Sequence, residues 1–175
     1  SGTITMTGLA NEMINAIVAV AGDKLFIALF LTMLCCIVLG MGVPTTATYC
    51  IMAATCAPIL TRMGVPILAA HFFVFYFAIM STITPPVALS SFVAAGLAKS
   101  DPVKTGVTGF RLAIAGFVIP FMLVYKPELL IVTNYGALVT TYSVITATVG
   151  IVMLAVANEG YFLGKLGVWQ RLLLV

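Results

Sequence analysis

Charge is the property that this sequence has least of. Of its 175 residues, 7% are charged and 62% are hydrophobic. Soluble domains carry about 25% charged residues and about 45–50% apolar ones, so this composition is too apolar for a surface that faces water. It excludes soluble enzymes, nucleic-acid-binding domains and disordered tails. We therefore interpret the chain as a membrane protein.

Acidic side chains are missing from the long apolar stretches. All five lie at their ends or between them: Glu12, Asp23, Asp101, Glu128 and Glu159. A proton-coupled pump usually keeps Asp or Glu inside its membrane spans, so proton coupling through these stretches is disfavoured. The single histidine, His71, lies in an aromatic segment. It is either an interfacial or hydrogen-bonded core residue, or a ligand or proton relay.

The sequence also has no motif of enzyme chemistry. It contains no Gly-x-Ser-x-Gly turn, no P-loop and no dinucleotide fingerprint. An intramembrane enzyme would need a nucleophile and a base, and only His71 with scattered Ser and Thr is present. The cysteines match neither a zinc site nor a redox pair, and we expect them to act as small apolar residues: Cys35, Cys36, Cys50 and Cys56. We predict that the protein is not an enzyme.

Two uncharged runs occupy the middle of the chain, from residue 25 to 61 and from residue 63 to 98. A straight helix needs only about 20 residues to cross a bilayer. Each run is too long for one straight span and too short for two spans with a loop. Each run must therefore be interrupted.

The interruptions are marked by glycine and proline. Gly40, Gly42 and Pro44 divide the first run, which predicts a re-entrant helical hairpin over residues 25–62 that begins and ends on one membrane face. Thr84-Pro85-Pro86 divides the second run, which predicts a discontinuous helix over residues 68–98. The prolines lack amide hydrogens, so carbonyls one turn upstream are expected to lose their partners.

The remaining segments complete an all-α, polytopic transmembrane fold. We expect an interfacial helix over 7–22, transmembrane helices over 108–125 and 136–157, and an interfacial helix over 161–175. More of the basic residues fall on the face opposite the ends of the hairpin, which favours that face as cytoplasmic. The chain begins with Ser rather than Met and shows no signal peptide, so we expect a piece of a longer chain.

Neutral polar residues gather at both interruptions: Thr45, Thr46 and Thr48 at the first, and Ser81, Thr82 and Thr84 at the second. Hydroxyl and carbonyl oxygens suit a dehydrated alkali cation. Two half-helices are expected to begin at Thr45 and Val87, and helix N-termini favour an anionic group such as a carboxylate. The pattern predicts one site for Na⁺ and a carboxylate. The alternative is that glycine and proline only kink packed helices.

Three stretches together resemble a known family: GMGVPTTATY at 40–49, AHFFVFYFA at 70–78 and ITPPVA at 83–88. They are similar to the large permease subunit of tripartite ATP-independent periplasmic (TRAP) transporters, the DctM-like subunit. The second stretch looks most like the fused permeases that join the small and large subunits in one chain, the 4TM/12TM type, which work with a TAXI-type receptor. The resemblance covers most of residues 7–127.

The resemblance implies an elevator transporter with two inverted repeats. Residues 1–127 would be its C-terminal repeat, and residues 128–175 would be the extra C-terminal helices of fused members. Such a permease takes up a small organic anion with Na⁺ across the bacterial or archaeal cytoplasmic (inner) membrane. Its partners would be a periplasmic binding protein, the N-terminal remainder of the same chain and membrane lipid, but no nucleic acid. Na⁺ would be its coupling ion, with no other cofactor.

The resemblance also implies positions for the site. Substrate would be bound at Thr45, Thr46, Thr48, Ser81 and Thr82. Na⁺ would be bound at Gly40, Gly42, Val43, Pro44, Thr84, Pro85 and Pro86. Many unfused subunits place an Asp shortly after the Gly-Met, where Val43-Pro44 stands here, so the ion stoichiometry does not carry over. C4-dicarboxylate, amino acid, sugar acid and aromatic acid stay open as substrates. Another ion-coupled carrier or a channel with Pro/Gly gating kinks is the alternative.

Overall fold

The computed structural model describes residues 9–131, 136–162, 164 and 166–172, and its regular elements are helices. This confirms the predicted all-α class. The first half contains α2 (Leu9–Ala21), α3 (Leu25–Gly40), α4 (Thr45–Thr55) and α5 (Ala57–Arg62). The second half contains α6 (Ile67–Met80), α7 (Leu89–Ala98), α8 (Pro102–Tyr125), the 3-10 turn η1 (Pro127–Leu130), α9 (Ala137–Glu159) and α10 (Val168–Leu172).

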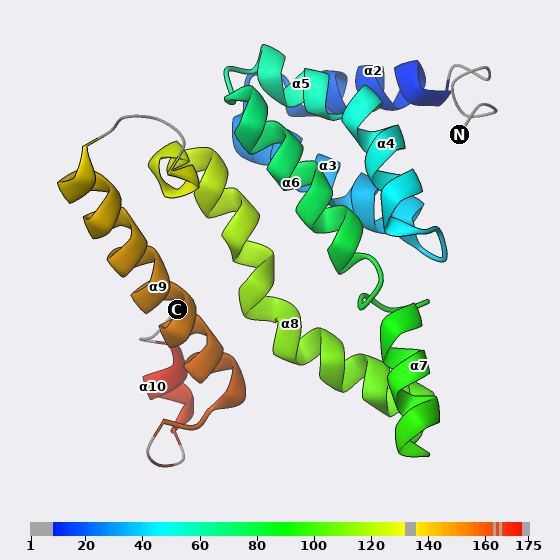
Figure 1. The fold of residues 1–175 in the computed structure, drawn as a ribbon, viewed down its shortest axis with the longest axis vertical. Helices are drawn as coiled ribbons and strands as arrows, with labels where there is room; N and C mark the ends of the chain where they lie inside the picture. The colour runs from blue at the N-terminus through cyan, green and yellow to red at the C-terminus, as the bar shows by residue number, and fades with distance from the viewer. Residues whose placement is uncertain (1–8, 132–135, 163, 165, 173–175) are drawn as a thin grey trace.

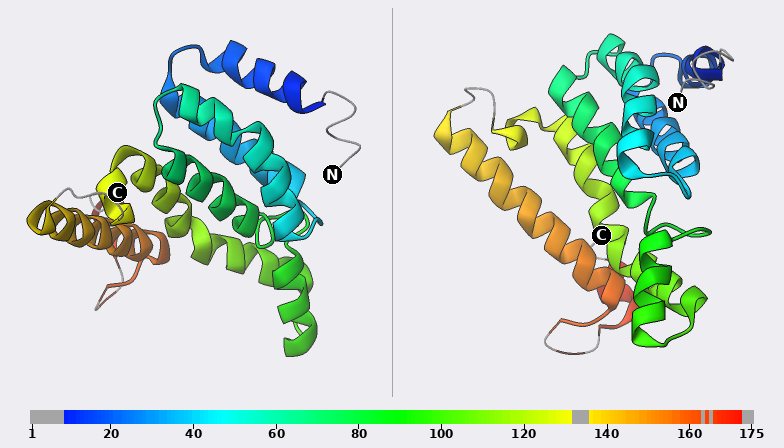
Figure 2. Two further views of the ribbon diagram at one scale, coloured as in Figure 1. Left: turned by 45° about the horizontal axis from the view of Figure 1, so that its top comes forward. Right: turned by 45° about the vertical axis from the view of Figure 1, so that its right-hand side comes forward.

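The helices are arranged around α6. On one side, α3 and α4 run antiparallel and both pack against α6 (Figure 1). On the other side, α8 packs against α6 and carries α9 on its far face (Figure 2). The C-terminal end of α7 and the N-terminal end of α8 lie together at the opposite end of the molecule from α5 (Figure 1). α6 is therefore the element that joins the two halves.

Aromatic side chains hold α6 in this position. Phe73 and Phe77 are fully buried. The ring of Phe73 lies 5.2 Å from that of Phe121 on α8, in an edge-to-face arrangement, and the ring of Phe77 lies 5.8 Å from that of Phe117. Such pairs contribute about 0.5–1.5 kcal/mol each beyond the area they bury. The aromatic stretch found in the sequence is therefore the α6–α8 interface.

Helix length separates two kinds of element. α8 and α9 are long and apolar enough to cross a membrane, and only 6% of the apolar window of α9 is buried. α3 has 16 residues, which is about 24 Å at ~1.5 Å per residue, and falls short of the roughly 30 Å hydrocarbon core. α6, with 14 residues, and α7, with 10, are shorter still.

Polar contacts fasten α9 to α8 at Arg111 and to η1 at Glu128, where Lys126 adds an ion pair within the same connecting segment. Near one end, Arg111 Nη2 donates to the carbonyl of Asn158 at 3.1 Å, and Asn158 Nδ2 donates to the carbonyl of Arg111 at 2.6 Å. At the other end, Ser143 Oγ donates to Glu128 Oε1 at 3.2 Å, and Lys126 Nζ lies 3.6 Å from the same oxygen. These contacts set the register of the two long helices.

Some boundaries differ from the sequence-based expectation. The helix expected to begin at Thr108 begins at Pro102, because the Asp101 carboxylate accepts the Lys104 N–H at 2.8 Å and caps it. The helix expected to open at Val87 begins at Leu89, because Ala88 has a left-handed φ of +35°. Of the expected interfacial helix 161–175, the described part contains only α10. Residues 7–8, 163, 165 and 173–175 of the expected interfacial helices lie outside the described residues.

The contact at η1 generates a pH prediction. A hydrogen bond with its own backbone amide, together with the Ser143 hydroxyl and the Lys126 ammonium, lowers the pKa of the Glu128 carboxyl below its ordinary value. A carboxyl with a lowered folded-state pKa stabilises the fold above its unfolded-state pKa of about 4.3, and that contribution is lost as pH falls through the folded-state pKa.

We therefore expect the melting temperature in detergent to fall below about pH 4 by more in the wild type than in Glu128→Gln. Because the side chains are near the surface, the difference should be small, on the order of 1 °C. Ser143→Ala removes one of the contacts that lower the pKa of Glu128, so its loss of melting temperature at low pH should lie between that of the wild type and that of Glu128→Gln. Identical pH profiles for the wild type and Glu128→Gln would contradict the assignment.

Candidate functional site

The two interruptions of the chain meet in space. Gly40, the last residue of α3, lies directly against Ser81 at the end of α6. A Cβ atom added at Gly40 would overlap the Ser81 hydroxyl and would lie 2.6 Å from Ser81 Cβ and 3.2 Å from Thr48 Cγ2. A Cβ added at Gly42, which has φ +76°, would lie 4.0 Å from Val87 Cγ1, an ordinary van der Waals contact. The turn 41–44 therefore packs on the break, defined here as residues 81–88.

Hydroxyl groups complete the end of α6. Ser81 Oγ donates to the Ala78 carbonyl at 2.8 Å, and Thr82 Oγ1 donates to the Ile79 carbonyl at 2.8 Å. Thr84 Oγ1 donates to the Met80 carbonyl at 2.7 Å. The Ser81 and Thr82 carbonyls, one turn upstream of Pro85 and Pro86, accept the N–H groups of Thr84 at 3.4 Å and of Ser90 at 3.0 Å, which corrects the expectation that they lose their partners. Each hydroxyl has used its hydrogen and keeps oxygen lone pairs, which is what a cation ligand requires.

Other carbonyls at the interruptions accept no bond. Within the described residues, no hydrogen bond reaches the main-chain carbonyls of Met41, Gly42, Val43, Pro85, Pro86 and Val87. The peptide bond between Pro85 and Pro86 is cis. Gly42, Pro44, Pro85 and Pro86 are exposed, whereas Ser81 and Thr84 beside them are buried. The free oxygens therefore lie at the surface of the contact, and the hydroxyls lie beneath it.

The two half-helices present their N-termini differently. α4 begins at Thr45 after Pro44, with no side-chain cap, so its first amides are free to meet an anion. Thr46 is exposed there, and Thr48 is buried with its hydroxyl 3.4 Å from the Pro44 carbonyl. α7 also lacks a side-chain cap, but the Ser90 N–H donates to the Thr82 carbonyl at 3.0 Å. The α7 N-terminus is thus partly satisfied by the break itself.

His71 and the cysteines are the other reactive side chains that the sequence singled out. Tyr49 Oη and His71 Nδ1 are 3.2 Å apart, which ties α4 to α6. This geometry fits the hydrogen-bonded interpretation of His71. The four cysteines are free thiols, with Cys36 and Cys56 buried and Cys50 exposed.

Two features of the structure were missed from the sequence. Thr32 on α3 is fully buried, and its Oγ1 has no hydrogen-bond partner among the described residues. Thr32 lies four residues before Cys36 and eight before Gly40, so the three share one buried face of α3. That spacing could have shown from the sequence that Thr32 is buried.

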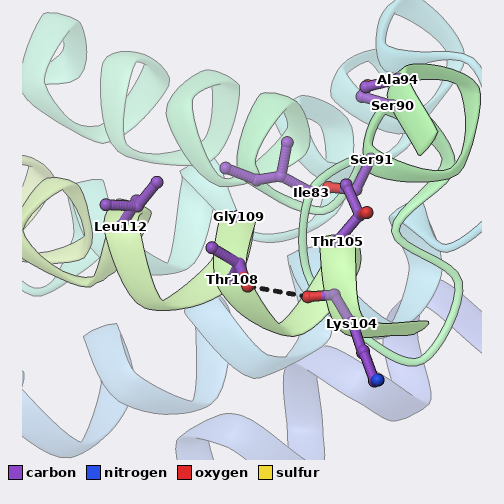
Figure 3. Close-up of a pocket in the computed structure, with 9 residues that line it drawn as sticks. All are labelled: Ile83, Ser90, Ser91, Ala94, Lys104, Thr105, Thr108, Gly109 and Leu112. Atoms are coloured by element: carbon purple, nitrogen blue, oxygen red, sulfur yellow. Dashed lines mark hydrogen bonds between the residues drawn. The ribbon is translucent and has the colours of Figure 1, made fainter. Parts of the chain in front are cut away.

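The second missed feature is a hollow between α7 and α8, with a volume of about 470 Å³ (Figure 3). Most of its surface is apolar, and hydroxyl side chains interrupt it. It is lined by Ile83, Ser90, Ser91, Ala94, Lys104, Thr105, Thr108, Gly109 and Leu112. The lining residues 105, 108, 109 and 112 follow helical spacing, so they share one face of α8 that could have been recognised from the sequence. It was missed because α8 was expected to begin only at Thr108.

Comparison with known proteins gives one match. A family model described as the DctM component of the tripartite ATP-independent periplasmic transporter matches residues 1–138. The matched residues include both interruptions, the hollow and the whole of α8. No curated protein and no solved structure gives a match.

The Gly40–Ser81 contact generates a stability prediction. We expect Gly40→Ala to lower the melting temperature by about 2–12 °C, because overpacking costs about 1–3 kcal/mol, and each kcal/mol lowers the melting temperature by roughly 2–4 °C at this size. Gly96→Ala in α7, where an added Cβ meets nothing within 4 Å, is the matched control and should be neutral or slightly stabilising. Adding Ser81→Gly to Gly40→Ala should recover part of the loss. Equal melting of Gly40→Ala and the control would show that the two interruptions do not touch.

Proposed function

Because the chain belongs to the DctM family of tripartite ATP-independent periplasmic transporters, multi-pass permeases of the inner membrane that work with a periplasmic binding protein, we propose that it drives uptake of a small organic carboxylate with Na⁺. The family is one of transporters and not of enzymes. The proposal concerns the coupling ion and the cargo.

The contact between the turn 41–44 and the break 81–88 carries this proposal. It gathers free carbonyls and hydroxyl oxygens from two interrupted helices in one place. Backbone that leaves the helix at membrane depth is tolerated only where it lines a cavity or binds something. A ligand set made only of oxygens suits a hard cation such as Na⁺, and the free first turn of α4 suits a carboxylate beside it.

Each group of residues is given a role in this proposal. The oxygens and close backbone approaches of the two interruptions bind Na⁺: Gly40, Gly42, Val43, Pro44, Thr84, Pro85 and Pro86. The hydroxyls and the amides of the α4 N-terminus bind the cargo: Thr45, Thr46, Thr48, Ser81 and Thr82. Support comes from the burial of Thr48, Ser81 and Thr84 at the contact and from the missing side-chain cap of α4.

The proposed architecture follows from helix length. α3 and α4 are each too short to cross, so they form a re-entrant hairpin over 25–62, and α6 with α7 cross together as the broken helix 68–98. Residues 1–127 then form the C-terminal repeat of an elevator, with a first repeat elsewhere in the permease. Residues 128–175, of which α9 lies almost wholly beyond the matched 1–138, are extra helices of a fused, TAXI-type permease.

The test reconstitutes the permease in liposomes with its periplasmic binding protein and measures uptake against Na⁺ concentration. We expect Thr84→Val to raise the half-saturating Na⁺ concentration about fivefold, equivalent to ~1 kcal/mol for one lost oxygen ligand. The Met80 carbonyl still accepts the Ile83 N–H at 3.1 Å, so the fold should persist. Thr84→Ser should restore the wild-type value.

The matched control is Thr141→Val in α9. Its hydroxyl donates to the Ala137 carbonyl at 2.7 Å, the same kind and length of bond as that of Thr84, far from the contact in sequence and in the fold. The control should leave the Na⁺ dependence unchanged. Uptake that is indifferent to Na⁺, or currents that need no binding protein, would overturn the proposal and favour another carrier or a channel.

A further inference from the structure

The hollow between α7 and α8 adjoins the break but is built from other residues. Ile83, within the break, forms part of its wall. The rest comes from the first turns of α7 and from the first half of α8 (Figure 3). Its volume of about 470 Å³ falls in the range of small-molecule pockets, roughly 300–1,000 Å³.

Glycine on α8 explains both the close packing and the space. A Cβ added at Gly109 would lie 3.0 Å from Ser91 Oγ, and one at Gly106 would lie 3.6 Å from Ala88 Cβ. The absence of a side chain at Gly109 lets the Ser91 hydroxyl face into the hollow. A larger residue there would fill the space or displace Ser91.

The hydroxyl groups that line the hollow are of two kinds: some already donate their hydrogen to a carbonyl, and others do not. Thr108 Oγ1 donates to the Lys104 carbonyl and Thr105 Oγ1 donates to the Asp101 carbonyl, both at 2.8 Å, so neither has a hydrogen to spare. The hydroxyls of Ser90 and Ser91 have no hydrogen-bond partner among the described residues, and Ser91 is only 8% exposed. Ser90 is exposed, and the Ser91 hydroxyl is not among the fully enclosed atoms, so the hollow offers accessible hydroxyl donors that a ligand can use.

The charge of the hollow has one sign. Among the described residues that line it, Lys104 alone is charged, and its side chain extends away from Ser91 and Thr105 (Figure 3). Asp101 is nearby in sequence, but its carboxylate accepts the Lys104 N–H as the cap of α8. A cation at the mouth with free donors inside suits an anion.

We propose that this hollow receives the carboxylate of the transported anion, with Ser90 and Ser91 as donors and Lys104 as the cation at its mouth. The anion occupies the hollow as it moves between the break and the membrane face on which Lys104 lies. This inference rests on the proposed function only in taking the cargo to be an organic anion. It adds a second binding region that uses none of the residues assigned to Na⁺.

The test uses charged thiol reagents as probes, so that it does not depend on knowing the cargo. Ser90→Cys is introduced into the full permease in a Cys50→Ala background, which removes the exposed native thiol. The protein is treated with a negatively charged sulfonatoethyl methanethiosulfonate and, separately, with its trimethylammonium counterpart. We expect the negative reagent to react at least about fivefold faster relative to the positive one, because a local positive charge steers anions.

That ratio should fall to about one in Lys104→Gln and should be kept in Lys104→Arg. Leu97→Cys, exposed on the same helix but outside the hollow, is the matched control and should show no preference that depends on Lys104. Lys104→Gln should also raise the KM for anion uptake while the half-saturating Na⁺ concentration stays the same.

Two outcomes overturn the inference. Ser90→Cys that reacts with neither reagent would mean that the hollow is covered in the whole permease, and equal rates with both reagents would mean that it does not select anions. Both leave Na⁺-driven uptake intact when it is measured in the same liposomes. Loss of Na⁺ dependence in the wild type would instead contradict the proposed function.

Discussion

Unpaired peptide groups in a low-dielectric environment are the constraint on which this structure depends. The prolines of the break lack amide hydrogens, and the Ser81 and Thr82 carbonyls one turn upstream instead accept the N–H groups of Thr84 and Ser90. The hydroxyls of Ser81, Thr82 and Thr84 donate to the last carbonyls of α6. Their hydrogens are used at the helix end, and their oxygen lone pairs stay free.

α8 connects the end of α6 to the rest of the molecule. Its aromatic half packs against α6 through Phe117 and Phe121, and its small-residue half packs against α7 through Gly106 and Gly109. Its outer face holds α9 by the paired bonds of Arg111 and Asn158. One helix therefore sets the distance between the two parts of the broken helix and supports the C-terminal span.

The sequence allowed the interruptions to be predicted but not their meeting. Glycine and proline mark helix breaks through local backbone geometry, so 40–44 and 84–86 could be found without a structure. The approach of Gly40 to Ser81 depends on how α3 packs against α6, which no local pattern encodes. Asp-Pro suits both a turn and a helix start, so Asp101-Pro102 alone does not fix where α8 begins. The expected start at Thr108 therefore left out the first turns of α8, which carry Lys104 and Thr105 of the hollow.

The fit of Gly40 against Ser81 also has a mechanical consequence. Gly40 ends α3 and Ser81 directly follows α6, so the contact joins the ends of two helices that are separated in the chain by α4 and α5. It leaves no room for a side chain at position 40. A movement that parts the turn from the break must open this contact first, so the position of the turn depends on the position of the end of α6.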